Sequence, residues 1–163
     1  MTDTINEHSY LIRPARLEDV PAMLEVLKTV NMHHIPSVEM PELDYRCYFV
    51  AEVEGRIIGI CGYKILSATE GKTTLLAVLP DYRRWGVGRA LQVKRMRVLL
   101  DQGIRFLLTN ADRPETITWY KKHFGYQEIG FLAKEHEFGL PNVHYWTTLK
   151  TDLIAWNDGY KHE

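Results

Sequence analysis

The stretch between residues 73 and 110 constrains the fold most strongly, because it contains one strand–helix–strand unit. Residues 73–79 form an apolar run rich in leucine and β-branched residues. A helical pattern follows over roughly 87–102, and residues 104–110 form a second apolar run. Such a unit places its two strands parallel in one sheet, joined by a right-handed crossover. The chain therefore contains a sheet with helices packed on it.

The rest of the chain alternates between hairpin strands and single helices. Glu54-Gly55, between two runs of β-branched and aromatic residues, is typical of a tight hairpin turn. In chain order we expect strands over 9–13, 46–53, 56–65, 73–79, 104–110, 126–133 and 143–149, and helices over 17–30, 87–102 and 114–124. The sequence thus predicts an α/β (α+β) fold with a mixed sheet, and residues 150–163 carry no clear signal.

The composition excludes several classes of protein. The 163 residues, 45% hydrophobic and 25% charged, suit one globular domain over residues 1–163. A net charge of −1 argues against a nucleic-acid partner. The chain has neither an apolar run near the ~20 residues that cross a bilayer nor the basic start of a secretory signal, so we expect no membrane partner. Cys47 and Cys61 are too few for a disulfide framework or a closed zinc site, which favours reduced thiols in a cytoplasmic protein without a metal.

A strand end, a pair of glycines and a helix start follow one another over residues 76–91. The first turn of a helix carries unpaired N–H groups and a partial positive charge. Gly86 and Gly88 allow the phosphates of a ligand to approach that backbone closely. Three arginines, Arg83, Arg84 and Arg89, add positive charge around the same turn. A diphosphate is the ligand that this arrangement predicts.

The charge distribution agrees with an anionic ligand at this turn. Residues 80–105 hold seven bases and two acids, whereas residues 37–54 hold one base and five acids. The near-zero net charge therefore combines a basic segment suited to a phosphorylated cofactor with an acidic segment suited to an amine.

Two widespread phosphate motifs do not fit the chain. A dinucleotide-binding fingerprint needs a glycine or alanine where Leu91 stands, and it needs an acid after a following strand for the ribose. A P-loop needs a glycine where Leu66 stands, although Gly71-Lys72-Thr73 supplies the rest of that motif. No helix begins after Thr73, so we interpret Gly71-Lys72-Thr73 as a hairpin turn.

Two motifs carry a resemblance to a known family. Arg83-x-x-Gly86-x-Gly88, after a strand and before a long helix, resembles the [QR]-x-x-G-x-[GA] motif of the GNAT superfamily of acyl-coenzyme-A-dependent N-acyltransferases. The segment from Ile117 to Tyr126 resembles the family's helix that ends in Tyr-x-x-x-apolar-Gly-Phe, with Tyr120 as the tyrosine. The resemblance covers roughly residues 9–149. It implies a GNAT-like, mostly antiparallel sheet that is splayed at a central parallel pair, with helices on both faces.

The resemblance also implies acetyl-CoA as the cosubstrate. Coenzyme A would lie where the sheet splays, its pyrophosphate on the backbone of the glycine turn and its pantetheine arm paired with the end of the preceding strand. Asn110, at the end of the other parallel strand, would reach the cofactor or the acceptor. The cofactor-binding residues so implied are Leu76, Ala77, Val78, Arg83, Arg84, Gly86, Val87, Gly88, Arg89, Ala90 and Asn110.

The implied reaction is transfer of an acetyl group from acetyl-CoA to a primary amine by direct attack in a ternary complex. The backbone N–H near Val78 would polarise the thioester carbonyl. Tyr120 would protonate the departing thiolate, since a phenol keeps its proton at neutral pH. The alternative is that Tyr120 only packs against the cofactor.

The general base is left open by the sequence. Many relatives carry a glutamate on the strand before the glycine turn, but residues 73–78 include no carboxylate. The candidates are Glu52, Glu70, Asp81, His33, His34 and His144. A water relay to bulk solvent, with no dedicated base, is the alternative.

The acceptor that the resemblance implies is a primary amine of a small molecule, an amino acid, or a peptide or protein. In the family, residues corresponding to 30–45 and 131–145 set acceptor specificity, which makes His33, His34 and His144 candidate substrate-binding residues. Glu52, on a neighbouring strand, is a further candidate. The acids of these loops would attract a cationic amine, although loops are also polar simply because they face water. The chain departs from the family at Arg113 and Thr116, where relatives often carry asparagine and alanine.

Two other functions stay open at this point: a coenzyme-A-binding regulatory module with weak or no catalysis, and a non-enzymatic interaction domain. The missing strand carboxylate favours the regulatory module, whereas Tyr120 opposes it. Family members often form dimers, which leaves a homodimer open, but the sequence carries no interface signal.

Overall fold

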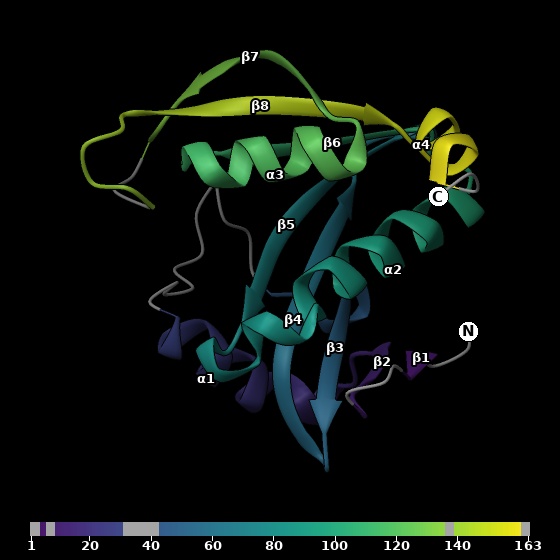
Figure 1. Cartoon of the computed structure of the whole chain (residues 1–163), viewed down its shortest axis with the longest axis vertical. Coiled ribbons are helices and arrows are strands. Elements are labelled where there is room, and N and C mark those ends of the chain that lie inside the picture. The colour runs from purple at the N-terminus through teal and green to yellow at the C-terminus, as the bar shows by residue number, and fades with distance from the viewer. Residues whose placement is uncertain (1–3, 6–8, 31–42, 136–138, 161–163) are drawn as a thin grey trace. The chain divides into compact units, whose positions relative to one another are not determined.

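The computed structural model describes residues 4–5, 9–30, 43–135 and 139–160. The strands of this part of the chain are β1 (Thr4–Ile5), β2 (Leu11–Pro14), β3 (Tyr48–Val53), β4 (Arg56–Ile65), β5 (Glu70–Val78), β6 (Phe106–Ala111), β7 (Gln127–Ala133) and β8 (Tyr145–Asp152). The helices are α1 (Val20–Thr29), α2 (Val87–Asp101), α3 (Pro114–Phe124) and α4 (Leu153–Tyr160), with short 3-10 segments at Leu17–Asp19, Tyr45–Cys47 and Pro80–Trp85 (Figure 1).

The strands are hydrogen-bonded in the order β1-β2-β3-β4-β5-β6-β8-β7. β5 and β6 are parallel, as the strand–helix–strand unit requires, whereas β1–β2, β2–β3, β3–β4, β6–β8 and β7–β8 are antiparallel. The parallel register runs from Glu70 opposite Phe106 to Lys72 opposite Leu108, and both strands continue beyond this last pair. The predicted fold class, a mixed and mostly antiparallel sheet with one central parallel pair, is confirmed.

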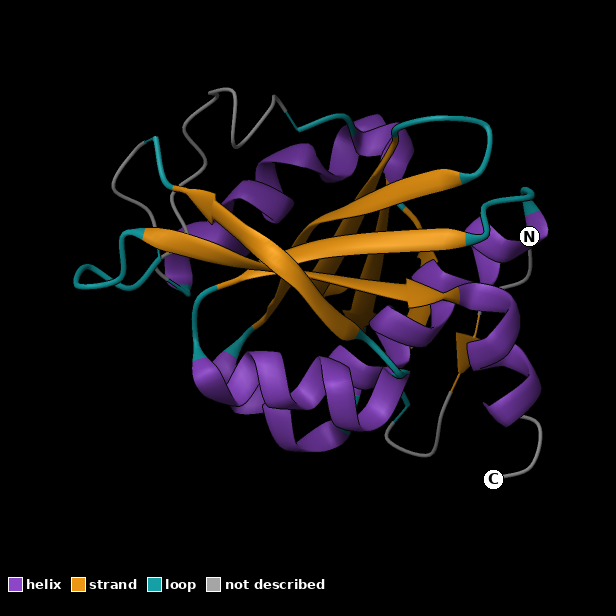
Figure 2. Cartoon of the chain, turned by 90° about the horizontal axis from the view of Figure 1, so that it is seen from above, coloured by secondary structure: helices purple, strands orange, loops and turns teal. Residues whose placement is uncertain are grey.

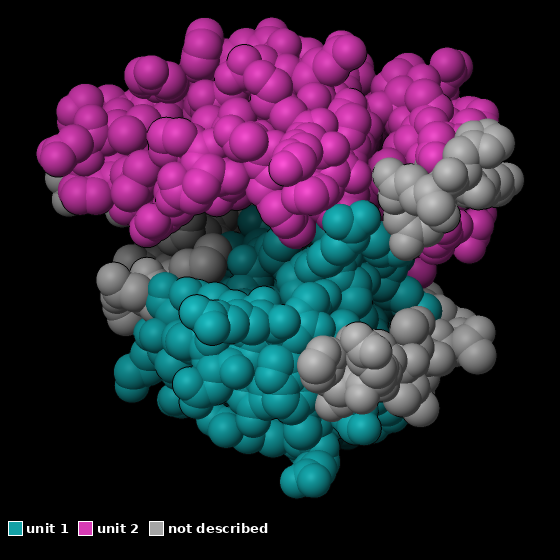
Figure 3. Space-filling view, viewed as in Figure 1, with its two compact units in different colours: residues 1–63, 74–95 teal, residues 64–73, 96–163 magenta. Residues whose placement is uncertain are grey.

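The chain separates into two compact units, which Figure 3 colours differently. Unit 1 comprises residues 1–63 and 74–95, and unit 2 comprises residues 64–73 and 96–163. Unit 1 buries apolar side chains of β3, β4, α1 and the first part of α2, among them Met23, Val50, Ile58, Ile60 and Leu91. In unit 2, α3 packs against β8, and the Thr151 hydroxyl donates to the Phe124 carbonyl at 2.9 Å. β7 lies across β8, with a register shift between Glu128 and Gly130 (Figure 2).

Three differences from the predicted elements have local causes. Gly71-Lys72-Thr73 lies inside β5 rather than in a turn, because the hairpin closes earlier, where the N–H groups of Leu66 and Ser67 donate to the Glu70 carbonyl. The segment after Pro80 forms a 3-10 turn before α2 begins. The tail contains α4, whose start is capped by Asp152: its Oδ1 accepts from the N–H groups of Ile154 and Ala155.

A buried ion pair joins β2 of unit 1 to the start of α1. The guanidinium of Arg13 donates to the Asp19 carboxylate at 2.7 Å, with both side chains less than a tenth exposed, and to Glu52 at 3.1 Å. Chiefly because of the Arg13 hydrogen bond, the pKa of the Asp19 carboxyl lies below its ordinary value. A carboxyl with a lowered folded pKa stabilises the fold above its unfolded pKa, and that contribution is lost as pH falls through the folded pKa.

We therefore expect Asp19→Asn to lower the free energy of unfolding at pH 7 by about 3 kcal/mol, because it leaves the Arg13 charge undercompensated. The difference from wild type should narrow as the pH falls below about 4, because the Asp19 carboxyl becomes protonated first in the unfolded chain and only at lower pH in the folded one. Urea unfolding at several pH values measures both effects. Asp44→Asn is the control, since the Asp44–Arg46 pair is exposed and its loss should change little. Equal effects of the two variants would contradict the prediction.

Candidate cofactor-binding and active site

The glycine turn joins β5 to α2 within unit 1. Gly86 has φ 77° and ψ 16°, a left-handed conformation that glycine adopts without strain. A Cβ placed on Gly86 would meet no atom within 4 Å, and one on Gly88 would meet only the Val78 side chain at 3.8 Å. The Ala90 N–H donates to the Gly86 carbonyl, so the helical hydrogen-bonding pattern begins at this turn. Open space over the first turn of a helix fits the approach of a diphosphate.

The basic side chains of the turn have different environments. The Nε of Arg83 donates to the Val78 carbonyl at 3.2 Å, which ties the turn to the end of β5. Arg84 and Arg89 are exposed beside the start of α2, where the helix dipole also favours an anion. The Tyr10 hydroxyl, just before β2, donates to the Gly86 carbonyl at 3.4 Å. The turn is thus held from two sides while the predicted phosphate-binding face keeps its positive charge.

The last residues of β5 precede this turn. Ala77 and Val78 are buried, Leu76 is partly exposed, and the Leu79 N–H donates to the Ile58 carbonyl at 2.8 Å. Beneath them Arg95 is fully buried, and its guanidinium donates to the carbonyls of Gly62 and Leu75, each at 2.9 Å. The backbone that is predicted to pair with a pantetheine arm is therefore braced by a residue of α2.

The predicted concentration of positive charge is only partly directed at the turn. Arg95 is used inside unit 1, as described above. In unit 2, Arg97 lies over the Trp156 ring and donates to Asn157, and Arg105 pairs with Asp152. Three of the seven bases counted over residues 80–105 thus form contacts away from the glycine turn. A count along the chain could not separate them from the bases at the turn, because it does not record which side of α2 a residue occupies.

Tyr120 lies on α3, in unit 2, and is 5% exposed. Its ring centroid lies 5.0 Å from that of Trp119 and 4.9 Å from that of Tyr126. Its carbonyl accepts from the N–H groups of Gly125 and Tyr126, where the helix ends with Gly125 at φ 69°. The ring is therefore held in a fixed position by packing and by the helix terminus.

Asn110 lies on β6 of the same unit. Its Oδ1 accepts from the Thr148 hydroxyl at 2.7 Å. Asn110 and Thr148 line a groove of about 370 Å³, together with Lys72, Leu108, Ile129, Gly130, Phe131 and Leu132. Residues 107, 109 and 111 of the strand are buried and the intervening ones are not, so this groove lies on the more open face of the unit-2 sheet.

The structure places the candidate bases and acceptor residues in separate surroundings. Glu52 is engaged by Arg13, and Glu70 pairs with Lys150 at 3.3 Å. Asp81 and the His144 side chain are exposed. His33 and His34 lie outside the described residues. Within the part of the chain that the structure describes, no group of three or more histidine, cysteine or acidic side chains is arranged to hold a metal ion.

The cysteines offer no activated nucleophile. Both are free thiols, Cys61 buried and Cys47 partly exposed. Burial raises the pKa of the Cys61 thiol to about 11, and it also raises the pKa of Cys47 above its ordinary value. Because the thiolate is the nucleophilic form, neither group suits a covalent acyl intermediate at neutral pH.

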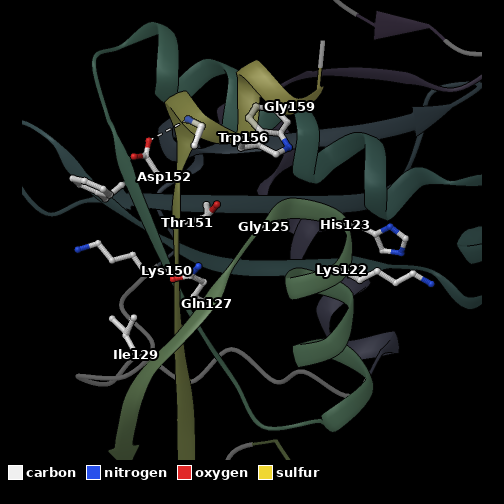
Figure 4. A pocket seen from close by; sticks show the side chains of 12 residues that line it. Lys122, His123, Gly125, Gln127, Ile129, Lys150, Thr151, Asp152, Trp156 and Gly159 are labelled. Atoms are coloured by element: carbon white, nitrogen blue, oxygen red, sulfur yellow. Dashed lines mark hydrogen bonds between the residues drawn. The ribbon is translucent and has the colours of Figure 1, made fainter. Parts of the chain in front are cut away.

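A second hollow of unit 2, of about 510 Å³, is lined by the end of α3, the starts of β6 and β7, the end of β8 and one side of α4. Figure 4 shows that Lys122 and His123 extend away from Gln127 and Lys150, so that the charged groups do not converge. Asp152, also on this hollow, is occupied in capping α4 and pairing with Arg105. We assign this hollow no role in the reaction.

Among the described helices, none is long and apolar enough to cross a membrane.

Comparison with known sequences settles the family. The family model described as "Acetyltransferase (GNAT) domain" matches residues 44–128, more than half of the chain. The chain belongs to the GNAT acetyltransferase family. The resemblance predicted from the two motifs is confirmed, and so is the predicted enzyme class, an acyl-CoA-dependent N-acetyltransferase.

Individual GNAT relatives cover most of the chain. An "Uncharacterized N-acetyltransferase" of Chlorobaculum tepidum is 32% identical over 123 residues, 72% of this chain and 76% of that protein. An "N-alpha-acetyltransferase" of Sulfurisphaera tokodaii is 29% identical over 147 residues, 80% of this chain and 87% of that protein. The structure of N-acetylglutamate synthase from Neisseria gonorrhoeae, complexed with coenzyme A and N-acetyl-glutamate, superimposes with a TM-score of 0.67 and 24% identity, over 91% of this chain and 36% of that one.

Proposed function

We propose that this GNAT chain transfers an acetyl group from acetyl-CoA to the α-amino group of an amino acid or peptide, by direct attack in a ternary complex. The observation that carries the proposal is the open glycine turn between β5 and α2, whose backbone and arginines suit a diphosphate. Two comparisons support the α-amine: one relative is named an N-alpha-acetyltransferase, and a solved structure of the fold contains N-acetyl-glutamate.

Acetyl-CoA supplies a thioester, which is activated for acyl transfer. The first turn of α2, with Gly86, Gly88 and the exposed Arg84 and Arg89, would bind its pyrophosphate. The end of β5, from Leu76 to Val78, would pair with the pantetheine arm, and the Val78 N–H would donate to the thioester carbonyl as negative charge develops there. Arg83 and Arg95 would act indirectly, since both hold the β5 backbone through its carbonyl groups.

The amine nitrogen forms the new bond to the acetyl carbon, and the bond from that carbon to sulfur breaks. Tyr120 would donate its phenolic proton to the departing thiolate, and the proton that the attacking nitrogen loses as the amide forms would return to the phenolate through water. The ammonium proton of the acceptor must leave before attack. We propose that water carries it to bulk solvent, because Glu52 and Glu70 are held in ion pairs and residues 73–78 offer no carboxylate. The unbridged thiols of Cys47 and Cys61 suit a cytoplasmic location for this reaction.

A panel of amines tests the function. The purified chain is mixed with acetyl-CoA and one of three acceptors. The first is glutamate, the second is a tripeptide with a free N-terminus, and the third is an N-acetylated tripeptide whose only amine is a lysine side chain. We expect release of free thiol with the first two acceptors and little with the third, since only the first two offer an α-amine. Turnover on the lysine side chain alone would contradict the α-amine assignment.

One observation favours a second function, a coenzyme-A-binding module without catalysis. Of the candidate carboxylates, Glu52 and Glu70 are held in ion pairs and Asp81 is exposed, so no positioned base is evident among the described residues. Calorimetric titration with coenzyme A discriminates the two functions. Binding without thiol release on any amine would favour the module, and the absence of binding would reject both.

A further inference from the structure

A buried ion pair in unit 2 joins the end of β6 to the segment that follows β7. The Lys134 ammonium donates to the Asp112 Oδ2 at 2.8 Å, with the two side chains 5% and 9% exposed. The same ammonium lies 4.5 Å from the centroid of the Trp146 ring on β8 and donates to the Leu140 carbonyl at 3.3 Å. One side chain thus contacts three separate segments of the chain.

The pair also holds residues 139–144, the end of the connection between β7 and β8. The Leu140 N–H donates to the Asp112 Oδ2 at 2.7 Å, and the Lys134 N–H donates to the His144 carbonyl at 3.0 Å. Gly139 has φ 73°, and a Cβ at this position would overlap the Asp112 carboxylate. The 139–144 segment therefore has little freedom to move relative to the end of β6.

Stability alone is a weak reason for this arrangement. Burying two charges removes them from water, and a well-packed apolar pair of similar volume is often at least as stable. A buried pair does, however, define one geometry, because each charge must meet its partner. The Asp112–Lys134 pair specifies where the 139–144 segment lies more strictly than apolar packing would.

The position of the pair relates it to the acceptor. Asp112 follows the carboxyl end of β6, the parallel partner of β5, and ligands of open α/β sheets bind beyond the carboxyl ends of parallel strands. Asn110, two residues earlier, lines the groove with Phe131 and Leu132 of β7, the strand that leads to Lys134. We infer that Asp112 and Lys134 are positioning residues that fix the 139–144 segment as one wall of the acceptor site and so select among α-amines. This inference rests on the proposed function.

The double variant Asp112→Asn/Lys134→Met tests it, because it removes both charges and leaves neither one buried alone. The hydrogen-exchange rate of the Leu140 amide is measured in the unliganded chain. The values of kcat and KM are measured with glutamate and with the tripeptide that has a free N-terminus. We expect exchange at Leu140 to accelerate about tenfold or more. The KM values of the two acceptors should rise unequally, changing the ratio of their kcat/KM by about fivefold or more, while the KM for acetyl-CoA stays within about twofold.

Two further variants distinguish a change in the position of the 139–144 segment from a general loss of folding. Lys134→Arg keeps the cation and should restore most of the wild-type selectivity. Gly139→Ala keeps both charges but displaces the segment, so it should change the selectivity in the absence of any charge change. The control is Lys121→Met/Glu128→Gln, which removes another ion pair of unit 2 and should leave the acceptor ratio unchanged.

The outcomes separate this inference from the function on which it rests. Faster exchange at Leu140 with an unchanged acceptor ratio would overturn the inference and leave the acetyltransferase function in place. If kcat/KM falls equally with both acceptors, and falls as much in the control variant, the pair only stabilises the fold. That outcome would also overturn the inference. A wild-type chain that acetylates neither acceptor would overturn the proposed function and the inference together.

Discussion

Replacing Tyr120 by phenylalanine should lower kcat by roughly 10²-fold, the typical contribution of a positioned general acid. The substitution removes one hydroxyl and keeps the ring that packs between Trp119 and Tyr126, so the fold of α3 should persist. The dissociation constant of acetyl-CoA should change little, because the proposed proton transfer occurs after binding. Thiol release under saturating acceptor and a calorimetric titration measure the two quantities.

Tyr126→Phe is the matched control for this variant. Tyr126 is 2% exposed, lies in the same unit and contacts the ring of Tyr120, but we assign it no step of the reaction. Removal of the Tyr126 hydroxyl should leave kcat within about twofold of wild type. Wild-type turnover in Tyr120→Phe would remove the phenol from the mechanism and leave Tyr120 as a packing residue. Equal losses in both variants would point to packing in the aromatic cluster instead of acid catalysis.

The parts of the fold that sequence could predict are those with a strong local signal. The strand–turn–helix stretch around Gly86 combines an apolar run, a pair of glycines and a long helical pattern, and the structure reproduces each of them. The helix from Pro114 to Phe124 is equally well defined, because proline suits its first turn and Gly125 its left-handed end. These two segments also carry the family motifs, so the fold and the enzyme class followed from the same residues.

Other features depend on contacts between distant residues, which no local pattern reveals. α4 contains Asn157 and Gly159 and has no clear amphipathic pattern, but Asp152 caps its start and Trp156 packs beneath Arg97. The buried Arg95 looks like one more surface base in the sequence, and only the structure shows that it satisfies two strand carbonyls. Asp112 and Lys134 are 22 residues apart and match no motif, so sequence reasoning missed them. The only signals in that part of the sequence were Lys134, just after a predicted strand, and Gly139, in the predicted loop that follows.

Replacing Gly86 by aspartate should weaken the binding of acetyl-CoA by about 10²-fold or more, because it places a carboxylate at the proposed pyrophosphate site. The open space around a Cβ at Gly86 means that the new side chain would fit the free protein without a clash. The left-handed φ of 77° adds a backbone strain of about 1 kcal/mol, which lowers stability modestly. Binding affinity should therefore fall much more than stability.

Gly55→Asp separates the effect of a charge at the proposed pyrophosphate site from the effect of backbone strain. Gly55 lies in the turn between β3 and β4, has φ 82°, and also has no atom within 4 Å of an added Cβ. The same substitution there imposes the same strain and the same charge at a site with no proposed ligand, so acetyl-CoA affinity should match that of wild type. Gly86→Asn, which keeps the size of aspartate without its charge, should bind with intermediate affinity if charge repulsion dominates. If Gly86→Asp binds acetyl-CoA as tightly as Gly55→Asp, the pyrophosphate does not lie on this turn, and the start of α2 has another role.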